Sequence, residues 1–163
     1  MAEAAVNHRI LIVGCGSIGE RHLRCFQRTG RVELATCDVN ESLLTTVSQR
    51  YQVPGFRDAS AALAAGQYDG VVICSPAHTH IGIAVESLGH GAAVLIEKPL
   101  STRIEDVDAL RSAVAAAGKF AAVEKDVVRP FQGEVVRQAG QGHAGVTQGE
   151  GRGRCGGRDR ADS

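Results

Sequence analysis

Three glycines, Gly14, Gly16 and Gly19, form the first group of residues whose spacing could support chemistry. They follow an apolar run of strand length and open a segment compatible with a helix. In a G-x-G-x-x-G loop, the first glycine permits a tight turn and the second lets a pyrophosphate approach the backbone, while the third allows close helix–strand packing. The start of a helix also offers free N–H groups to phosphates. The N–H groups expected there belong to Ser17, Ile18 and Gly19.

A carboxylate follows at the position where a dinucleotide's ribose would lie. Asp38 ends the second predicted strand and lies 19 residues after Gly19. An acid there accepts hydrogen bonds from ribose hydroxyls and repels a 2′-phosphate, so the pattern predicts NAD as the cofactor rather than NADP. Two alternatives stay open. The loop could be a plain glycine-rich turn beside a surface acid, or part of a methyltransferase that binds S-adenosylmethionine.

A second group of polar residues follows two later predicted strands. Ser75 and Pro76 come directly after one strand, and Glu97-Lys98-Pro99 ends the next. Ligands of open α/β sheets bind at the carboxyl ends of the strands. Lys98 is the predicted catalytic residue, because a mobile ammonium can donate to a substrate oxygen or place positive charge beside a nicotinamide ring. The alternative is a solvated Glu–Lys pair followed by a loop proline.

The remaining histidines and the cysteines predict no metal site. None of the five cysteines forms a C-x-x-C pair, which favours reduced, mostly buried thiols. No histidine has convincing ligand spacing with an acid or a cysteine. Taken alone, His80 could be an ordinary residue at the start of a helix, with no ligand role. The histidines expected to have no ligand role are His8, His22, His78 and His90.

Strands and helices that alternate through residues 9–123 must position these groups. The pattern predicts a Rossmann-type, doubly wound α/β fold with a parallel sheet. The expected strands are 9–13, 32–38, 53–56, 70–74, 93–96 and 120–123, and the expected helices are 17–29, 41–49, 59–65, 80–88 and 102–117. Asn40 and Asp58 are predicted helix caps, and Thr102-Arg103-Ile104-Glu105 fits a capping box.

Length and charge limit the remaining classes of function. A chain of 163 residues accommodates one domain and an appendage, which we expect at 8–125 and 126–163. The appendage is rich in glycine and arginine and is expected to be irregular or disordered. Its lack of aromatic residues after residue 133 disfavours an RNA-binding tail.

The balance of 18 basic and 18 acidic residues argues against nucleic acid as a partner. With no apolar run long enough to cross a bilayer and no secretory signal visible, we expect a cytoplasmic protein.

Three stretches of the chain together resemble the Gfo/Idh/MocA family of oxidoreductases, which includes glucose–fructose oxidoreductase and inositol dehydrogenase. They are Ile12 to His22, the segment Ser75-Pro76-x-x-x-His80, and Gly91 to Leu100 with its Glu97-Lys98-Pro99 end. The resemblance covers about residues 8–123. Ala77 stands where the family often has Asn, and Ala92-Ala93 replace a common Lys-His pair.

The resemblance implies an NAD(P)-binding domain and hydride transfer to or from a hydroxyl carbon of a sugar or cyclitol. It implies that Ser75, Pro76, His80 and Glu97 line the cofactor cleft and that Lys98 contacts both substrate and nicotinamide. Family members also carry a second domain that binds substrate, supports homo-oligomers and supplies an Asp/His pair. We therefore expect a truncated or frame-shifted product that binds cofactor with little turnover. The alternatives are a non-catalytic, nucleotide-sensing regulator and a poorly folded fragment.

Overall fold

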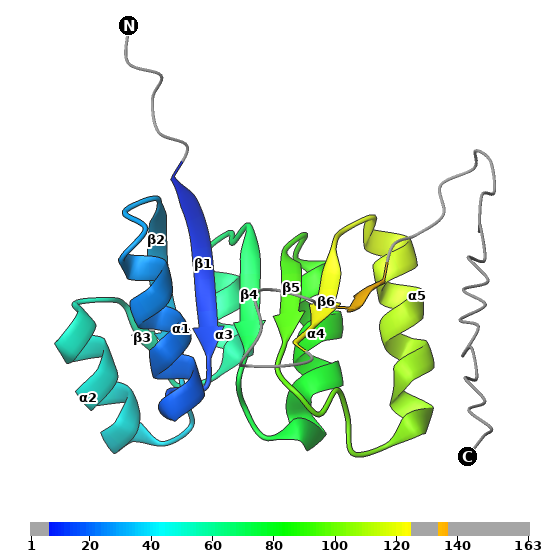
Figure 1. Cartoon of the computed structure of the whole chain (residues 1–163), viewed down its shortest axis with the longest axis horizontal. Coiled ribbons are helices and arrows are strands. Elements are labelled where there is room, and N and C mark those ends of the chain that lie inside the picture. Colours follow the sequence, from blue (N-terminus) through cyan, green and yellow to red (C-terminus); the bar gives the residue numbers. More distant parts are fainter. Residues whose placement is uncertain (1–6, 125–133, 137–163) are drawn as a thin grey trace, which may run out of the picture.

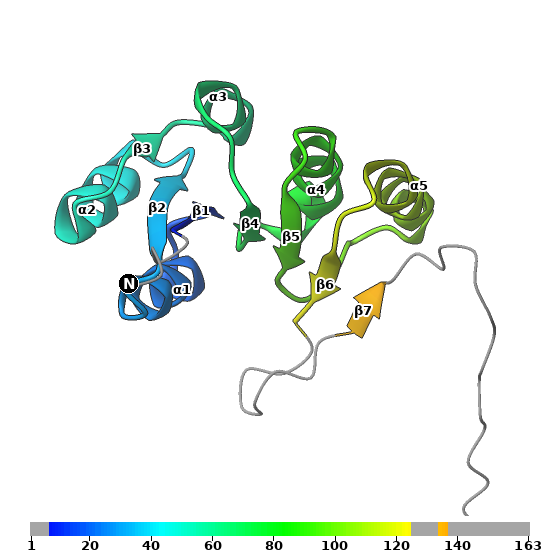
Figure 2. The ribbon, with the colours of Figure 1, turned by 90° about the horizontal axis from the view of Figure 1, so that it is seen from above.

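A computed structural model describes residues 7–124 and 134–136, which form one sheet with helices on both faces (Figures 1 and 2). The strands are β1 (His8–Val13), β2 (Val32–Cys37), β3 (Gly55–Phe56), β4 (Gly70–Ile73), β5 (Ala93–Ile96), β6 (Ala121–Val123) and β7 (Glu134–Val136). The helices are α1 (Ser17–Gln27), α2 (Glu41–Tyr51), α3 (Ala59–Ala65), α4 (His80–Gly89) and α5 (Val107–Ala117). The predicted α/β class is confirmed.

The strand order β3-β2-β1-β4-β5-β6-β7 places the switch point of the sheet between β1 and β4. Strands β1 to β6 are parallel, and they point downward in Figure 1. Val13 pairs with both Cys37 and Ile73, so the carboxyl ends of β1, β2 and β4 are level. A doubly wound sheet binds its ligands at this edge, outside the switch point.

Helices lie on both faces of the sheet (Figure 2), and an apolar layer holds the helices of each face against it. Along β1, Leu11 faces the layer that contains α3, α4 and α5, whereas Ile12 faces the layer that contains α1 and α2. Successive residues of a strand point to opposite faces, so a strand buried on both sides has a continuous apolar sequence. Leu11 and Ile12 are fully buried, which explains the apolar run in the sequence.

The caps predicted for α2 and α3 are confirmed, but the one for α5 is wrong. Asn40 accepts a hydrogen bond from the Leu43 N–H, and Asp58 accepts one from the Ala61 N–H. The helix after Thr102 begins only at Val107, after a single 3-10 turn over Ile104–Asp106. That turn winds more tightly than an α-helix, and no side-chain cap bond forms at the start of either element.

The predicted irregular tail contains a strand. Residues 134–136 form β7, which pairs antiparallel with β6 in the register Ala121↔Val136. The expectation of irregular structure is wrong for these three residues, because the free edge of β6 offers backbone groups that a passing segment can pair with. The rest of the predicted disordered segment lies outside the described residues. Within the described ranges, no helix has the length and apolar character needed to span a membrane.

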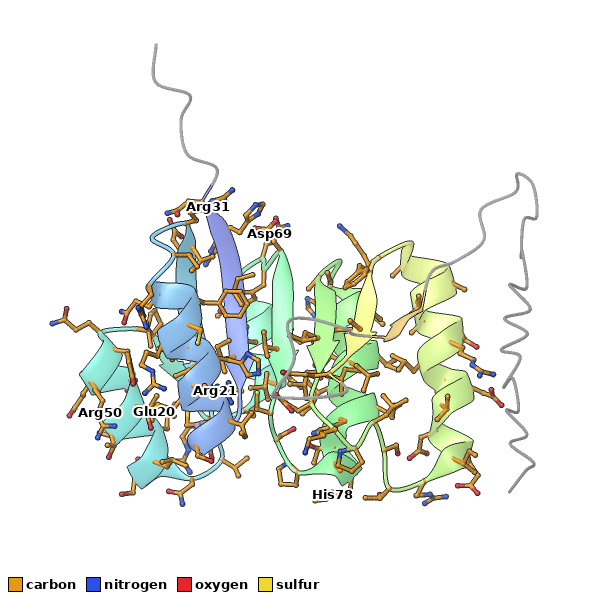
Figure 3. All side chains as sticks on the ribbon, viewed as in Figure 1. Glu20, Arg21, Arg31, Arg50, Asp69 and His78 are labelled. Atoms are coloured by element: carbon orange, nitrogen blue, oxygen red, sulfur yellow. The ribbon has the colours of Figure 1, made fainter. Side chains whose placement is uncertain are left out.

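Glu20 links α1 to α2. Its Oε1 atom accepts hydrogen bonds from Arg50 Nη1 at 2.5 Å and from the Tyr51 hydroxyl at 2.9 Å. Figure 3 shows Glu20 and Arg50 next to each other on the two helices. The hydrogen bond from Tyr51, followed by that from Arg50, holds the pKa of Glu20 below its usual value. The ionised carboxylate therefore stabilises the packing of α1 on α2.

We expect Glu20→Gln to lower the free energy of unfolding at neutral pH by about 0.5 to 1 kcal/mol, within the range of partly exposed charged pairs. Because the pKa of Glu20 is lowered by folding, its contribution is present above the unfolded pKa of about 4.3 and is lost as the pH falls. Urea unfolding at several pH values measures this difference. Glu33→Gln is the control, since Glu33 is exposed, makes a 3.7 Å contact with Arg9 and accepts a 3.3 Å hydrogen bond from Asn7 at the surface. An equal loss in both variants, or a loss independent of pH, would contradict the assignment.

Candidate functional site

The loop between β1 and α1 turns tightly against the end of β4. Gly14 has φ +98°, in the left-handed region, and a Cβ there would lie 2.8 Å from the carbonyl carbon and oxygen of Cys74. Its N–H donates to the Cys37 carbonyl at 2.8 Å. Only glycine fits this backbone conformation and this close approach. The first glycine therefore has the structural role that its position in the motif predicts.

The other two glycines of the loop differ in what surrounds them. A Cβ on Gly19 would lie 1.7 Å from the Gly14 carbonyl oxygen, so this glycine allows α1 to approach β1. A Cβ on Gly16 would meet no atom within 4 Å. Gly16 therefore faces open space at the start of α1, and the two residues after it, Ser17 and Ile18, are exposed. The absence of a side chain at Gly16 leaves room for a ligand rather than for packing.

Asp38 lies beside this open space and also holds the loop. Its two carboxylate oxygens accept hydrogen bonds from the Cys15 N–H at 2.7 Å and from the Asn40 N–H at 2.8 Å. A carboxylate oxygen has more than one acceptor site, so Asp38 can still accept from a ligand hydroxyl. The contact with Cys15 connects the end of β2 to the glycine loop, and the sequence pattern alone did not predict it.

A cavity of about 600 Å³ joins these groups at the carboxyl edge. Of the predicted site residues, Gly14, Gly16, Asp38, Ser75 and Pro76 line it. The lining also includes residues that sequence reasoning did not single out or expected to have no role: Val39, Leu43, Arg57, His78, Thr79 and Ile83. His78, labelled in Figure 3, lies at this edge of the sheet. A separate cavity of about 440 Å³, lined in part by Val32 and Tyr68, contains none of the predicted residues.

His80 lies behind the cavity wall rather than in it. The side chain is buried, and its two ring nitrogens lie 2.7 Å from the Ser75 carbonyl oxygen and 3.0 Å from the Pro99 carbonyl oxygen. Both partners are acceptors, so both hydrogen bonds form only when each nitrogen carries a proton. His80 thereby ties the loop after β4 to the loop after β5, where the Lys98–Pro99 peptide is cis and Lys98 is exposed.

Glu97 is buried at the end of β5 and does not line the cavity. Its Oε1 atom lies 2.8 Å from His22 Nε2, and Glu124 Oε2 lies 3.3 Å from the same nitrogen. Cys74, at the end of β4, brings its thiol into this group. His22 and Glu97 are 75 positions apart. No local sequence signal indicated that His22, Cys74 and Glu124 would meet there.

The two carboxyl groups of this cluster differ in pKa. Burial raises the pKa of Glu124, and the contact with Glu97 raises it further. Burial acts in the same direction on Glu97, but hydrogen bonds from Glu124 and His22 outweigh it and hold its pKa below the usual value. Burial, with Glu97 and Glu124 nearby, also raises the pKa of the Cys74 thiol. Glu97 is therefore the stronger acid of the two.

Comparison with known proteins agrees with this geometry. The family model described as "Oxidoreductase family, NAD-binding Rossmann fold" (GFO_IDH_MocA) matches residues 8–125. Inositol 2-dehydrogenase of Burkholderia cenocepacia is 28% identical over 127 residues, which are 76% of this chain and 37% of that protein. D-apiose dehydrogenase of Paraburkholderia graminis is 29% identical over 66% of this chain and 29% of its own length. The chain thus spans about a third of the length of these curated relatives.

Solved structures give the same result. The WlbA dehydrogenase of Bordetella pertussis, solved in complex with NADH and UDP-GlcNAcA, superposes with a TM-score of 0.68 and 32% sequence identity over 72% of this chain and 37% of that one. GenD2 from gentamicin A biosynthesis, solved with NAD, gives a TM-score of 0.68 and 28% identity over 76% of this chain and 36% of that one. With its glycine loop, its strand order and a family match over residues 8–125, the chain belongs to the Gfo/Idh/MocA oxidoreductase family and has that family's NAD-binding Rossmann fold.

Proposed function

We propose that residues 8–125 bind NAD(H) in the cavity at the carboxyl edge and form the cofactor unit of a dehydrogenase. The observation that carries this proposal is the open space at Gly16, next to the start of α1 and beside Asp38. A pyrophosphate needs both close access to the backbone and free N–H groups, and this position offers the two together. The residues present therefore fit the cofactor.

Each part of the cavity wall has a proposed role. The N–H groups of Ser17, Ile18 and Gly19 lie in the first turn of α1, where they have no partner within the helix, and would bind the pyrophosphate. Asp38 would accept hydrogen bonds from the adenosine ribose and disfavour a 2′-phosphate, which supports NAD over NADP. Ser75 and Pro76 would form the wall towards the nicotinamide. His80 would hold that wall to the Glu97-Lys98-Pro99 loop.

Lys98 is the residue that we propose touches substrate. When bound, the nicotinamide supplies or accepts a hydride, and Lys98 would donate a hydrogen bond to the reacting oxygen. The relatives named inositol 2-dehydrogenase and D-apiose dehydrogenase favour a hydroxyl carbon of a sugar or cyclitol as the reacting centre. Lys98 is the one described residue that we assign to chemistry at this edge, so we expect this chain to bind cofactor with little turnover.

The compartment and the partners are also proposals. The four described cysteines, Cys15, Cys25, Cys37 and Cys74, are free thiols, which supports a reducing compartment and so the cytoplasm. A formal net charge of zero supports a small-molecule ligand over nucleic acid. Homo-oligomers are proposed only by analogy with the family.

Calorimetric titration with NADH and NADPH tests the cofactor proposal. We expect wild-type protein to bind NADH more tightly than NADPH. Asp38→Ala should weaken NADH binding by about 10- to 100-fold, the effect of losing hydrogen bonds to a charged group. It should weaken NADPH binding less, because the substitution also removes the repulsion between the Asp38 carboxylate and the 2′-phosphate of NADPH. Loss of the contact with Cys15 affects both cofactors alike, so the ratio of the two dissociation constants isolates the ribose contact.

Asp69→Ala is the matched control. Asp69 also accepts a hydrogen bond from a backbone N–H, that of Arg9 at 2.9 Å, but it lies at the opposite edge of the sheet (Figure 3). It should leave both dissociation constants unchanged. Absence of NADH binding by the folded wild-type protein would refute the proposed function. Equal losses of NADH and NADPH binding in Asp38→Ala would refute the ribose contact.

A further inference from the structure

Four side chains that could ligate a metal ion converge beside the cofactor cavity, and the cofactor proposal leaves three of them without a role. We propose that His22, Cys74, Glu97 and Glu124 form a binding site for a zinc-class divalent cation. The site draws one ligand each from α1 and from the ends of β4, β5 and β6. It goes beyond the proposed function, although Cys74 also lines the cofactor cavity. Metal binding and dinucleotide binding are measured separately, so the two proposals can fail independently.

The separations of the ligand atoms suit one small cation. The ligating atoms of His22, Cys74 and Glu97 all lie within 4.8 Å of one another. His22 Nε2 is 2.8 Å from Glu97 Oε1 and 3.3 Å from Glu124 Oε2. Around tetrahedral zinc, with bonds of about 2.0 to 2.3 Å, ligand atoms lie roughly 3 to 4 Å apart. Small side-chain movements would therefore bring these three groups to tetrahedral spacing, and Glu124, 3.3 Å from His22 Nε2, is placed to add the fourth ligand.

An unsatisfied oxygen points to the same site. Glu124 Oε2 is buried and has no hydrogen-bond partner among the described residues. A buried acceptor without a partner is costly, and each such atom in a folded protein needs an explanation. This oxygen lies 3.3 Å from His22 Nε2, one of the proposed ligand atoms. A cation bound there would satisfy the oxygen.

The chemistry of the four groups selects the class of cation. Imidazole, thiolate and carboxylate are the ligands that zinc uses in proteins, whereas magnesium and calcium favour sites made of oxygen atoms alone. Within the described residues, the ion pairs of Glu97 and Glu124 are with His22 only, and no Lys or Arg ammonium or guanidinium lies within ion-pair distance. No other cation among the described residues thus competes for these two carboxyl groups, and a metal ion would displace the protons of Cys74 and Glu124 on binding.

Metal titration of the untagged, metal-free chain tests this proposal. The background carries Cys25→Ala and Cys155→Ala, which remove an exposed thiol and a thiol outside the described residues. We expect one equivalent of Zn²⁺ to bind by calorimetry. We expect Co²⁺ to give the visible bands of a four-coordinate ion with a thiolate-to-metal charge-transfer band. Adding Cys74→Ala should remove that band and weaken Zn²⁺ binding by about 100-fold or more, since loss of a direct ligand exceeds the usual second-shell effect.

The control and a second variant keep the test decisive. Cys37→Ala removes another buried free thiol and should leave the metal spectrum and affinity unchanged. Glu124→Gln keeps the side-chain volume and should weaken Zn²⁺ binding by at least about tenfold. That variant decides the matter if Cys74→Ala does not fold. The proposal is overturned if the background protein binds no stoichiometric Zn²⁺ or Co²⁺. It is also overturned if the charge-transfer band survives Cys74→Ala, or if Glu124→Gln binds as tightly as the background.

Discussion

Replacing Gly19 by alanine should unfold the protein or nearly so, with a loss of more than about 3 kcal/mol in the free energy of unfolding, at the upper end of the range for single substitutions. The added Cβ would lie 1.7 Å from the Gly14 carbonyl oxygen, which belongs to the backbone and has no free rotamer. Helix α1 would have to move away from β1. That movement would open the packing of Leu23 against Ile12, both of which are fully buried.

Urea and thermal unfolding followed by circular dichroism measure this effect. The matched control is Gly82→Ala, the same change inside α4, where a Cβ meets no atom within 4 Å. Alanine has a higher helix propensity than glycine, so this control should gain up to about 1 kcal/mol. A Gly19→Ala protein with wild-type stability would show that α1 does not pack on β1 as closely as described.

Replacing Gly16 by alanine should leave the free energy of unfolding unchanged, in contrast to Gly19→Ala. It should lower the affinity for NADH at least about tenfold, an effect comparable to losing a charge-assisted hydrogen bond. Gly16 has φ −63°, which any residue adopts, and its Cβ would meet no protein atom within 4 Å. The methyl group would instead occupy the space through which a pyrophosphate approaches the N–H groups of α1. Nothing in the folded protein without cofactor would resist the substitution.

Calorimetric titration with NADH and urea unfolding on the same preparation separate the two effects. Gly82→Ala is again the control and should bind NADH like the wild-type protein, since Gly82 is absent from the cavity lining. Wild-type NADH affinity in a stable Gly16→Ala protein would refute a pyrophosphate at this position. The two glycine variants together therefore distinguish packing from ligand binding within a single motif.

Where a residue carries a local signal, the sequence predicted the structure well. The apolar runs of β1 and β4 indicated strands buried on both faces, and Asn40 and Asp58 indicated helix starts that the structure confirms. These signals are local, because burial on two faces requires consecutive apolar residues and a cap requires one acceptor at one position. The prediction that Gly14, Gly16 and Asp38 lie together also depended on a simple rule, namely that parallel strands bring their carboxyl ends to one edge.

The sequence by itself thus determined the fold class, the glycine loop and the edge at which the site lies. Only the tertiary structure decided which side chains meet there: His22 reaches Glu97 across 75 positions, and His80 lies between two loops instead of in the cavity. It also placed β7 in a segment expected to be irregular. The physical reason is the same in each case, because contacts between distant residues depend on strand register and on the course of the chain between strands, and these depend on the whole core rather than on any local pattern.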